Sequence, residues 1–355
     1  MNVVVAAWVG SPNAGDELLF TALRRKLEAR GADVTVVSID PEATRRDHGV
    51  AAVHSRNIPG ILSAIRAADA LVLGGGGLLQ DETSHLNLPY HLSRVWAARL
   101  TGTPVAGVGL GAGALGSGFA RGLVRRALRR NRGIAVRDEE SASLLSALGV
   151  PGVVTAADLA FSLPAPPVER QDRLVVCLRS WPARARALPM SVRWRRDLGE
   201  DRLFGNLAAR LDEAAEATGL AVRFVAFHRG RDDVLHGRVA ERMRTPASSV
   251  APGPEGIVGE LGAARAVVTM RYHGGVLAAM QDRPIVLVGG SAKIASLAGA
   301  LGAGAATVPR DRNSLASLTG ALERVLPAED AVREAAARLR ERERGNDEVL
   351  DRLLG

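Results

Sequence analysis

Three basic side chains follow two predicted strands in the C-terminal half of the chain. Arg271 and His273 come directly after the apolar run at residues 266–270. Lys293 comes shortly after a second apolar run, at residues 285–288. Open α/β sheets bind ligands beyond the carboxyl ends of their strands, so we expect these side chains to lie together there. An arginine, a histidine and a lysine in one place could bind an anion and move a proton.

A helix is expected between these two strands. It opens at Gly274-Gly275 and continues over residues 276–280. Free N–H groups and the positive end of the helix dipole attract anions, so Gly274 is a candidate for binding one.

Lysine is rare in this chain. Only Lys26 and Lys293 are lysines among the 46 basic residues. Codon usage acting on a solvated loop would explain Lys293 without any function. An anion site that needs a compact ammonium group would explain it as well.

The composition limits the class of protein. A chain of 355 residues with 47% apolar and 3% aromatic residues can form two domains with cores of Leu, Val and Ala. A single cysteine, Cys177, excludes an internal disulfide and suits a reducing compartment. No apolar run approaches the roughly 20 residues of a membrane span. Met1 leads straight into an apolar strand without a charged leader, so we expect a cytoplasmic protein.

The net charge of +8 suggests an anionic partner. Arginine-rich codon usage would give the same charge without a function. Nucleic acid is disfavoured, because no basic run is interleaved with aromatic residues that could stack on bases. The densest basic cluster, at residues 121–137, fits the exposed face of a helix. It favours peripheral contact with an anionic membrane surface, such as the inner face of the plasma membrane.

Strands and helices alternate along the chain, which predicts two doubly wound, Rossmann-like α/β domains with parallel sheets. We expect an N-terminal domain over residues 1–161 and a proline-rich linker over residues 162–170. A C-terminal domain over residues 171–325 and a terminal helical stretch over residues 326–355, with a potential break at Gly345, would follow. Two such domains would face a shared cleft, where ligands often bind.

Glycine-rich loops are expected after two strands of the N-terminal half. Residues 74–77 follow the apolar run at 70–73, and the glycine-containing residues 109–113 follow the run at 104–108. Glycines there permit positive φ and close backbone approach. Their spacing departs from the dinucleotide-binding fingerprint, and they lie outside the first strand and helix, so we do not expect NAD.

Polar side chains also follow the N-terminal strands. Asn13, Asp16 and Glu17 come after the first strand, and Asp81 follows the first glycine run. The three carboxylates could complement the dipole of a helix start, or they could bind the hydroxyl groups of a substrate.

For other polar residues the sequence gives weaker evidence of a role in a site. Arg137 stands beside Asp138 at a strand end, where the two could form a surface ion pair with a helix cap or belong to the site. Asp158 is expected to be structural. The rim of the cleft is expected to carry His228, Asp232 and Asp233, without a clear role. Trp181 could stack on a sugar or pack in the domain interface.

Five segments, in their order along the chain, resemble the polysaccharide pyruvyl transferase family. They are Asn13-Ala14-Gly15-Asp16-Glu17, Gly74-Gly75-Gly76-Gly77-Leu78-Leu79-Gln80-Asp81, Val136-Arg137-Asp138, Ala157-Asp158-Leu159-Ala160 and Met270-Arg271-Tyr272-His273. Pro284 and Gly289-Gly290-Ser291-Ala292-Lys293 fit as well. The resemblance covers roughly residues 3–302.

The resemblance implies a fold similar to GT-B glycosyltransferases. It also implies transfer of a pyruvyl group from phosphoenolpyruvate to a sugar, which forms a cyclic ketal and releases phosphate. Members often act on lipid-linked saccharide precursors of cell-wall polymers or exopolysaccharide. No cofactor and no metal are implied, and we find no His/Cys/Asp cluster with metal-ligand spacing. The family often has an aromatic and an acidic residue before the late lysine, where this chain has Gly290-Ser291-Ala292.

This chemistry gives each candidate a role. Ketal formation needs a general acid and a general base with a pKa near neutral, and His273 is our candidate. The predicted catalytic set is His273, Lys293 and Arg137. The phosphate and carboxylate of the donor would be bound by Arg137, Arg271, Lys293, Gly274, Gly290 and Ser291. The acceptor sugar would be bound by Asn13, Asp16, Glu17 and Asp81.

Two other functions fit the same pattern. A GT-B glycosyltransferase that uses a nucleotide sugar would keep the fold, the cleft and the basic strand ends, but it would release a nucleotide. A catalytically inactive protein that binds glycans or anions would bind the same ligands without turnover.

Overall fold

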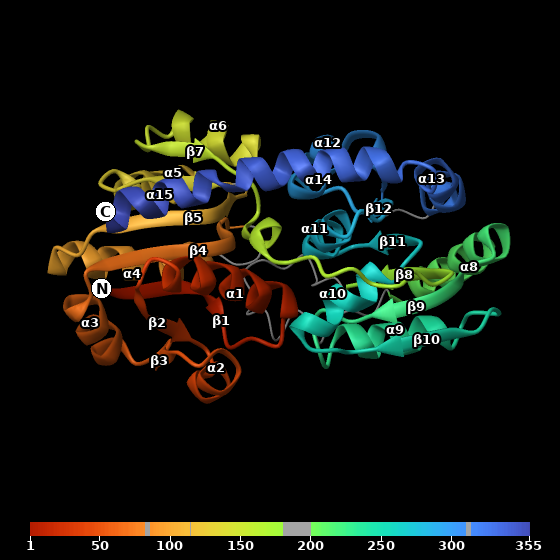
Figure 1. The fold of residues 1–355 in the computed structure, drawn as a ribbon, viewed down its shortest axis with the longest axis horizontal. Helices are drawn as coiled ribbons and strands as arrows, with labels where there is room; N and C mark the ends of the chain where they lie inside the picture. Colours follow the sequence, from red (N-terminus) through yellow and green to blue (C-terminus); the bar gives the residue numbers. More distant parts are fainter. Residues whose placement is uncertain (82–85, 114, 180–199, 310–313) are drawn as a thin grey trace.

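The computed structural model describes residues 1–81, 86–113, 115–179, 200–309 and 314–355. They form two α/β domains, each built on a parallel sheet with helices on both faces (Figure 1). The central strands are almost entirely apolar, because a parallel sheet covered on both faces is buried on both faces. This confirms the predicted fold class.

The N-terminal sheet has seven strands in the order β3-β2-β1-β4-β5-β6-β7. Its strands are β1 (Asn2–Val9), β2 (Asp33–Ser38), β3 (Ala51–His54), β4 (Ala70–Leu79), β5 (Val105–Ala112), β6 (Ile134–Val136) and β7 (Val153–Thr155). Its helices are α1 (Ala14–Glu28), α2 (Pro41–His48), α3 (Ile58–Ala67), α4 (Asn87–Thr101), α5 (Gly118–Leu128), α6 (Glu139–Ala147) and the short η1 (Leu159–Ser162). The strand order reverses between β1 and β4, which is where such sheets bind ligands.

The C-terminal sheet has six strands in the order β10-β9-β8-β11-β12-β13. Its strands are β8 (Arg173–Cys177), β9 (Ala221–Val225), β10 (Ala247–Val250), β11 (Ala266–Thr269), β12 (Ile285–Val288) and β13 (Ala305–Val308). Its helices are α8 (Glu200–Thr218), α9 (Asp232–Ala240), α10 (Pro254–Gly262), α11 (Tyr272–Met280), α12 (Ala292–Leu301), α13 (Leu318–Val325) and the short η3 (Gly302–Gly304) and η4 (Ser314–Ser317).

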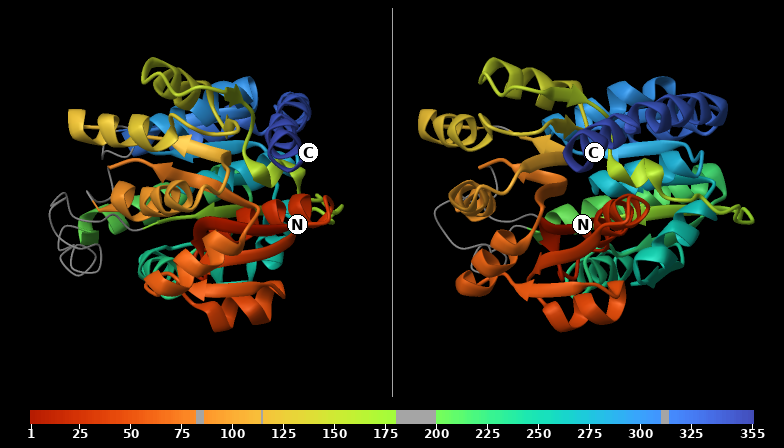
Figure 2. Two further views of the ribbon diagram at one scale, coloured as in Figure 1. Left: turned by 90° about the vertical axis from the view of Figure 1, so that its left-hand side faces the viewer. Right: turned by 60° about the vertical axis from the view of Figure 1, so that its left-hand side comes forward.

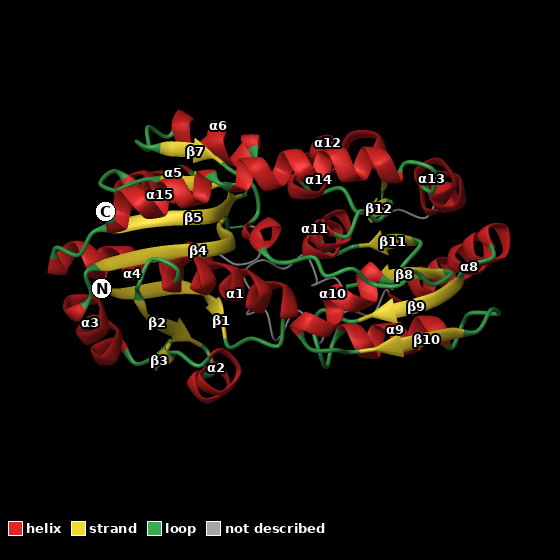
Figure 3. Cartoon of the chain, in the orientation of Figure 1, coloured by secondary structure: helices red, strands yellow, loops and turns green. Residues whose placement is uncertain are grey.

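The carboxyl ends of the two sheets point at each other (Figure 3). The domains also touch through their backbones at this place. The N–H of Ala14 donates to the carbonyl of Phe227 at 2.9 Å, and Asn13 forms an isolated antiparallel bridge with His228. The first turn of the N-terminal domain is therefore fixed directly to the loop after β9.

Apolar packing is continuous across the two domains. One core cluster contains Leu19 and Leu23 of α1, Leu261 of α10 and Leu277 of α11. Two further clusters fill the outer faces of the two sheets. None of the helices in the described part of the chain has the length and hydrophobicity that a membrane span requires.

The C-terminal helices join the domains a second time. Helix α14 (Glu329–Glu343) lies against α11 and α12, and α15 (Gly345–Leu354) lies against β5 and β6 of the N-terminal sheet (Figure 2). Asn346, where the predicted break occurs, is fully buried. Its Oδ1 accepts from the N–H of Gly109 at 2.7 Å, and its Nδ2 donates to the carbonyl of Ala157 at 3.1 Å.

The glycine runs differ from the prediction. We expected loops after strands that end at residues 73 and 108, but β4 continues to Leu79 and β5 to Ala112. Gly75 and Gly76 keep positive φ angles of 46° and 97° inside β4. Helix α1 packs closely on β4 at this point, since a Cβ on Gly75 would come within 3.0 Å of Leu19.

We predict that Asn346→Ala lowers the free energy of unfolding by about 2–4 kcal/mol, because two buried backbone groups lose their partner and each unpaired group costs about 1–3 kcal/mol. Urea denaturation would measure the change. The control is Glu348→Ala, an exposed position on the same helix, which should stay within about 0.5 kcal/mol of the parent. Equal effects of the two substitutions would contradict the anchoring role of Asn346.

Candidate functional site

Helix α11 starts earlier than the sequence suggested. It begins at Tyr272, with Arg271 as the N-cap residue, so His273 lies in the first turn rather than in a loop. Gly274 and Gly275 are inside the helix. A Cβ on Gly274 would come within 2.4 Å of the hydroxyl of Thr269, so the glycine is needed for close packing of the helix on β11. Gly274 is buried in this packing.

Arg137 is buried at the boundary between the domains. Its Nη1 donates to Oδ2 of Asp158 at 3.4 Å, and its guanidinium stacks 4.0 Å from the centre of the Tyr272 ring. A Cβ on Gly111 would come within 2.8 Å of the Arg137 side chain. The glycines at the end of β5 therefore make room for a guanidinium.

His273 lies across the domain boundary from α1. A Cβ on Gly15 would come within 2.3 Å of its Nδ1, so only glycine fits there. Its Nε2 lies 3.9 Å from Oδ2 of Asp158, is buried, and has no hydrogen-bond partner among the described residues. Burial, and then the charges of Arg137, Lys293 and Arg271, lower the pKa of His273 well below its ordinary value. The ring is therefore neutral at pH 7.

Arg271 is held by a buried carboxylate. One of its terminal nitrogens donates to Oδ1 of Asp232. The other oxygen of Asp232 accepts from the N–H groups of Phe227 and His228 at 3.1 and 2.9 Å. Asp232 thus fixes both the arginine and the loop that meets the N-terminal domain. The Nε atom of Arg271 is buried without a hydrogen-bond partner in the described part of the chain.

Lys293 lies in the first turn of α12 and faces Arg137 across a small pocket. The pocket has a volume of about 90 Å³ and is lined by Gly77, Gln80, Gly111, Ala112, Gly113, Arg137, Asp138, Glu140, Ser141, Ser291, Ala292 and Lys293. This is well below the roughly 300–1,000 Å³ that is typical for drug-sized ligands, so the pocket suits a small anion. Ser291 lines it, and Gly290 directly precedes Ser291.

Asp16 belongs to the same cluster. Burial raises its pKa to about 7, although a hydrogen bond from Nδ2 of Asn13 and the charges of Arg271 and Lys293 act in the opposite direction. A carboxyl group with this pKa can take up or release a proton near neutral pH. Asn13 is held in place by its bridge to His228.

The two other predicted acceptor residues lie elsewhere. Glu17 accepts from the N–H of Ser11 at 3.0 Å, and its second oxygen lies 2.8 Å from Nε2 of His48. It lines a separate pocket of about 810 Å³ between the domains. Both oxygens of Asp81 accept from the N–H of Gly116 at 3.1 Å, so this carboxylate orders the loop before α5. Like Asn13, Asp16, Arg271 and His273, neither of them lines the pocket with Lys293.

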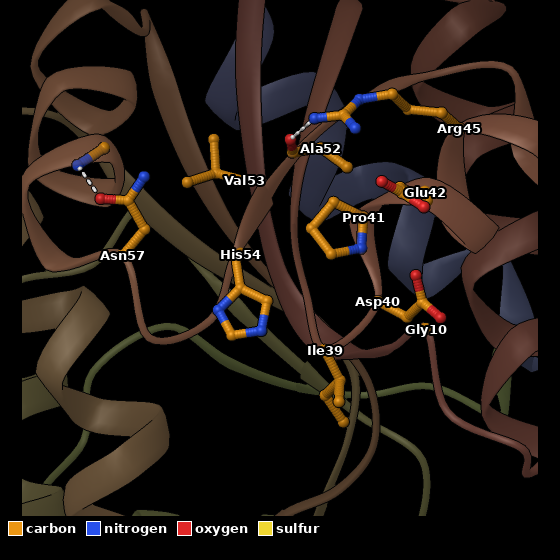
Figure 4. A pocket seen from close by; sticks show the side chains of 11 residues that line it. Gly10, Ile39, Asp40, Pro41, Glu42, Arg45, Ala52, Val53, His54 and Asn57 are labelled. Atoms are coloured by element: carbon orange, nitrogen blue, oxygen red, sulfur yellow. Dashed lines mark hydrogen bonds between the residues drawn. The ribbon is translucent and has the colours of Figure 1, made fainter.

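A further pocket of about 770 Å³ lies at the carboxyl ends of β2 and β3 (Figure 4). Asp40, Arg45 and His54 point toward it, and Arg45 also donates to the carbonyl of Ala52 at 2.8 Å. None of the predicted site residues lines this pocket.

Sequence analysis gave some residues of the site no role and gave another one a purely structural role. Asp158 was expected to be structural, yet it is the carboxylate shared by Arg137 and His273. Asp232 had no assigned role, and Tyr272 and Gly15 were named only as parts of motifs. Asp158 and Tyr272 both lie in motifs that resemble the family, and this could have marked them as site residues. Only the fold shows that they contact Arg137. Trp181, for which we considered stacking on a sugar or packing in the domain interface, lies outside the described residues.

The arrangement has the properties of an anion site. The cluster carries three cations, Arg137, Arg271 and Lys293. Buried nitrogens of both arginines, and Nε2 of His273, lack hydrogen-bond partners among the described residues. Buried polar groups are normally paired, so these nitrogens point to a ligand with several acceptor oxygens. The described residues contain no group of three or more His, Cys, Asp or Glu side chains that could hold a metal ion.

A comparison with protein-family models identifies the chain. The model of the polysaccharide pyruvyl transferase family matches residues 13–291, which include every predicted site residue except Lys293. The chain belongs to the polysaccharide pyruvyl transferase family. Membership indicates a transferase that acts in polysaccharide biosynthesis. No curated protein sequence matches the chain.

Solved structures share the fold at low sequence identity. S. aureus MnaA, in a co-structure with UDP, superposes with a TM-score of 0.65 and 11% identity over 99% of this chain and 95% of its own. A putative UDP-N-acetylglucosamine 2-epimerase from Listeria monocytogenes gives 0.66 and 13%, over 99% and 94%. The calicheamicin glycosyltransferase CalG4 gives 0.58 and 16%, over 99% and 98%. The family member therefore has a GT-B-like fold, as predicted.

We predict that Asp16→Asn stabilises the protein by about 1–3 kcal/mol at pH 8, and by much less at pH 5. The raised pKa means that folded Asp16 binds its proton more tightly than unfolded Asp16. Its contribution to stability is therefore present at low pH and is lost as the pH rises towards about 7. Asparagine cannot ionise and avoids this loss.

Urea denaturation of parent and variant at both pH values would test this. The control is Asp33→Asn, at an exposed position, which should show no such dependence on pH. An effect of Asp16→Asn that is the same at pH 5 and pH 8 would contradict the raised pKa.

Proposed function

We propose that the protein transfers a pyruvyl group from phosphoenolpyruvate to a sugar, forming a pyruvate ketal and releasing phosphate. The observation that carries this proposal is the convergence of three cations on one neutral histidine, with buried nitrogens on both arginines and on the histidine that make no hydrogen bond among the described residues. Phosphoenolpyruvate carries a phosphate and a carboxylate, so it needs several cationic partners. Arginines suit bidentate contacts with both groups.

The two domains would share the donor. Arg137 comes from the N-terminal domain, whereas Arg271 and Lys293 come from the C-terminal domain. Ser291 and Gly290 precede α12, where free backbone N–H groups can bind an anion. A bound anion would offset the cationic charges around His273 and raise the pKa of its ring towards the neutral range. Donor binding would in this way prepare the histidine for proton transfer.

The reaction requires balanced proton transfers. The methylene carbon of phosphoenolpyruvate gains a proton, and the adjacent carbon becomes an oxocarbenium-like cation. A sugar hydroxyl adds to this carbon and gives its proton to a base, for which His273 is the candidate. A second hydroxyl then closes the ring as the bond to phosphate breaks, and its proton leaves with the phosphate. Asp16, with a pKa of about 7, is the second candidate for proton transfer besides its predicted role in acceptor binding.

The acceptor is proposed to be a sugar of a cell-wall or exopolysaccharide precursor, including lipid-linked saccharides. Asn13 and Asp16 are proposed to bind it, because Asp16 interacts electrostatically with Arg271 and Lys293 and is hydrogen-bonded to Asn13, and Glu17 lines the larger pocket between the domains. We place the reaction in the cytoplasm, with peripheral contact between the protein and the inner face of the plasma membrane. No cofactor is proposed beyond phosphoenolpyruvate as co-substrate.

Glycosyl transfer from a nucleotide sugar is the second candidate. It is supported by the fold shared with a glycosyltransferase and with the UDP-bound MnaA. The volume of about 90 Å³ between Arg137 and Lys293 favours a small donor over a nucleotide sugar.

One assay separates the two candidates. The protein is incubated with a panel of glycosyl acceptors and either phosphoenolpyruvate or UDP-sugars, and released phosphate and UDP are measured. We expect phosphate release from phosphoenolpyruvate that depends on an acceptor. Release of UDP without phosphate would replace the proposal by the second candidate.

We predict that His273→Ala lowers the turnover number by about 10²–10⁴-fold, the usual contribution of general acid–base catalysis, and leaves much of the donor affinity. Phosphate release and calorimetric titration with phosphoenolpyruvate measure the two quantities separately. The control is His54→Ala, at an exposed position in another pocket. Near-normal turnover in folded His273→Ala would make this histidine a structural residue.

Substitution of the cations should change donor affinity as well. Arg137→Met and Arg271→Met are each expected to weaken donor binding by about 1.5–3 kcal/mol, the worth of a charged hydrogen bond. Lys293→Met should weaken both binding and rate. Lys293→Arg should restore them only in part, because a planar fork does not replace a compact ammonium. Unchanged donor affinity in all the methionine variants would contradict the proposed donor site.

A further inference from the structure

Exposed apolar side chains gather on one side of the N-terminal domain. Helices α3, α4 and α5 lie side by side and cover one face of the sheet (Figures 1 and 2). Ile58 and Leu62 of α3, Leu100 of α4 and Phe119 of α5 are 55%, 39%, 85% and 76% exposed. Most large apolar residues of the described chain are buried, so four exposed ones around a single groove are unusual.

The four side chains border a groove of about 400 Å³. Its floor and walls are lined by Ile58, Ile61, Leu62, Pro89, Leu92, Ser93, Arg94, Trp96, Ala97, Leu100, Phe119 and Leu123. Arg94 is the only charged residue among them, and its guanidinium is turned away to the carbonyl of Ser55 at 3.0 Å and to the Tyr90 ring. The surface of the groove is therefore almost wholly apolar.

The positive charge of the protein is concentrated beside this groove. Residues 83–137 contain nine arginines and no aspartate or glutamate. The net charge of the whole chain is +8, so the remaining residues together carry a charge of −1. Helices α4 and α5 lie within this acid-free segment, and α3 contains no acidic residue either.

Six of these arginines are exposed on α5 and just beyond it. They are Arg121, Arg125, Arg126, Arg129, Arg130 and Arg132. None of them forms an ion pair with another described residue. Arg99 of α4 lies 5.2 Å from the Trp96 ring, and its Nε and Nη2 are buried without hydrogen-bond partners among the residues described. These arginines therefore lie beside an apolar groove, and no carboxylate of the described residues neutralises their charge.

We propose that the α3–α4–α5 face, defined by the groove residues above and the six exposed arginines, docks on an anionic lipid bilayer. The exposed apolar side chains would enter the interface between headgroups and acyl chains, and the arginines would contact anionic headgroups. The positive charge of the arginines complements the negative headgroups, which makes an anionic bilayer the partner that fits this face. A second copy of the chain would bring two basic surfaces together, and nucleic acid would leave the apolar groove without a function.

The docking face and the proposed donor pocket are neighbours along the chain. Gly113 lines the pocket with Lys293, and Phe119 follows six residues later at the start of α5. A docked protein would hold its cleft near the bilayer surface, where the sugar of a lipid-linked acceptor would lie. This last step rests on the proposed function, whereas the docking face itself does not.

Vesicle co-sedimentation of the full chain tests the proposal. Vesicles of phosphatidylcholine alone are compared with vesicles that also contain phosphatidylglycerol. We expect binding only to the anionic vesicles, and weaker binding at high salt, because charges are screened over about 8 Å at physiological ionic strength. A basic residue near an anionic surface contributes about 1 kcal/mol, or about fivefold in partition. Changing Arg125, Arg126, Arg129 and Arg130 to Gln together should therefore reduce binding by at least about 100-fold.

The apolar part is tested by Phe119→Ser combined with Leu100→Ser, which should reduce binding by at least about tenfold. Two matched controls change other surfaces. Val234→Ser alters a 54% exposed apolar residue of α9, and a quadruple change to Gln removes four exposed arginines elsewhere, namely Arg25, Arg324, Arg338 and Arg352. Both controls should bind like the parent. Circular dichroism and phosphate release with a water-soluble acceptor should be unchanged in all variants.

Three results would overturn the proposal. They are absence of parent binding to anionic vesicles, equal loss of binding in the face variants and the controls, and a dimer in sedimentation that dissociates when Phe119 is changed. Failure of the reaction itself is distinguishable, because vesicle binding is measured without either substrate.

Discussion

Burying the guanidinium of Arg137 between the two domains would cost several kcal/mol if its charge were left without partners. The structure supplies Asp158 at 3.4 Å and the face of Tyr272 at 4.0 Å. Asp158 comes from the N-terminal domain, and Tyr272 comes from the C-terminal domain. Asp138, also in the N-terminal domain, lies 3.6 Å from Nε of Arg137, so the carboxylates stabilise the charge within one domain and only the Tyr272 contact requires both. The buried Nε of Arg137 makes no hydrogen bond with a described residue.

Close approach of the two domains depends on small residues. Gly15 allows α1 to meet His273, Gly111 admits Arg137, and Gly75 lets α1 lie on β4. A side chain at any of these positions would collide with a group in or beside the site. The glycine motifs are therefore explained by the shape of a cationic site, and they need not cradle a nucleotide.

The charges of the protein are divided between three tasks. Lys26 binds Glu343 and Asp347 at 3.0 and 2.7 Å and helps to hold the C-terminal helices, so one of the two lysines is structural. Lys293 belongs to the cationic cluster at the domain boundary, where burial and then the charges of Arg137, Lys293 and Arg271 lower the pKa of His273. The arginines of α5 face solvent without acidic partners. The net charge alone could not distinguish these three roles.

The sequence by itself determined the fold class, most helices and strands, and the family. The alternation of apolar runs and the order of the motifs are local features, and they need no knowledge of distant contacts. It missed α2, α9, α13 and the edge strands β3 and β10, because these are short or polar or are packed on fewer sides. It also described β4 and β5 as ending at their glycines, since the partner helix above them was not visible in the pattern.

Only the tertiary structure decided which candidates meet. It joined Asp16, Arg137, Arg271, His273 and Lys293, and it added Asp158, Tyr272 and Asp232 to the site. It separated Glu17 and Asp81 from the pocket that contains Lys293 by giving them other partners. The physical reason is that these groups are up to 277 residues apart in the chain. Their burial, charges and pKa values arise from contacts that exist only when the two sheets face each other.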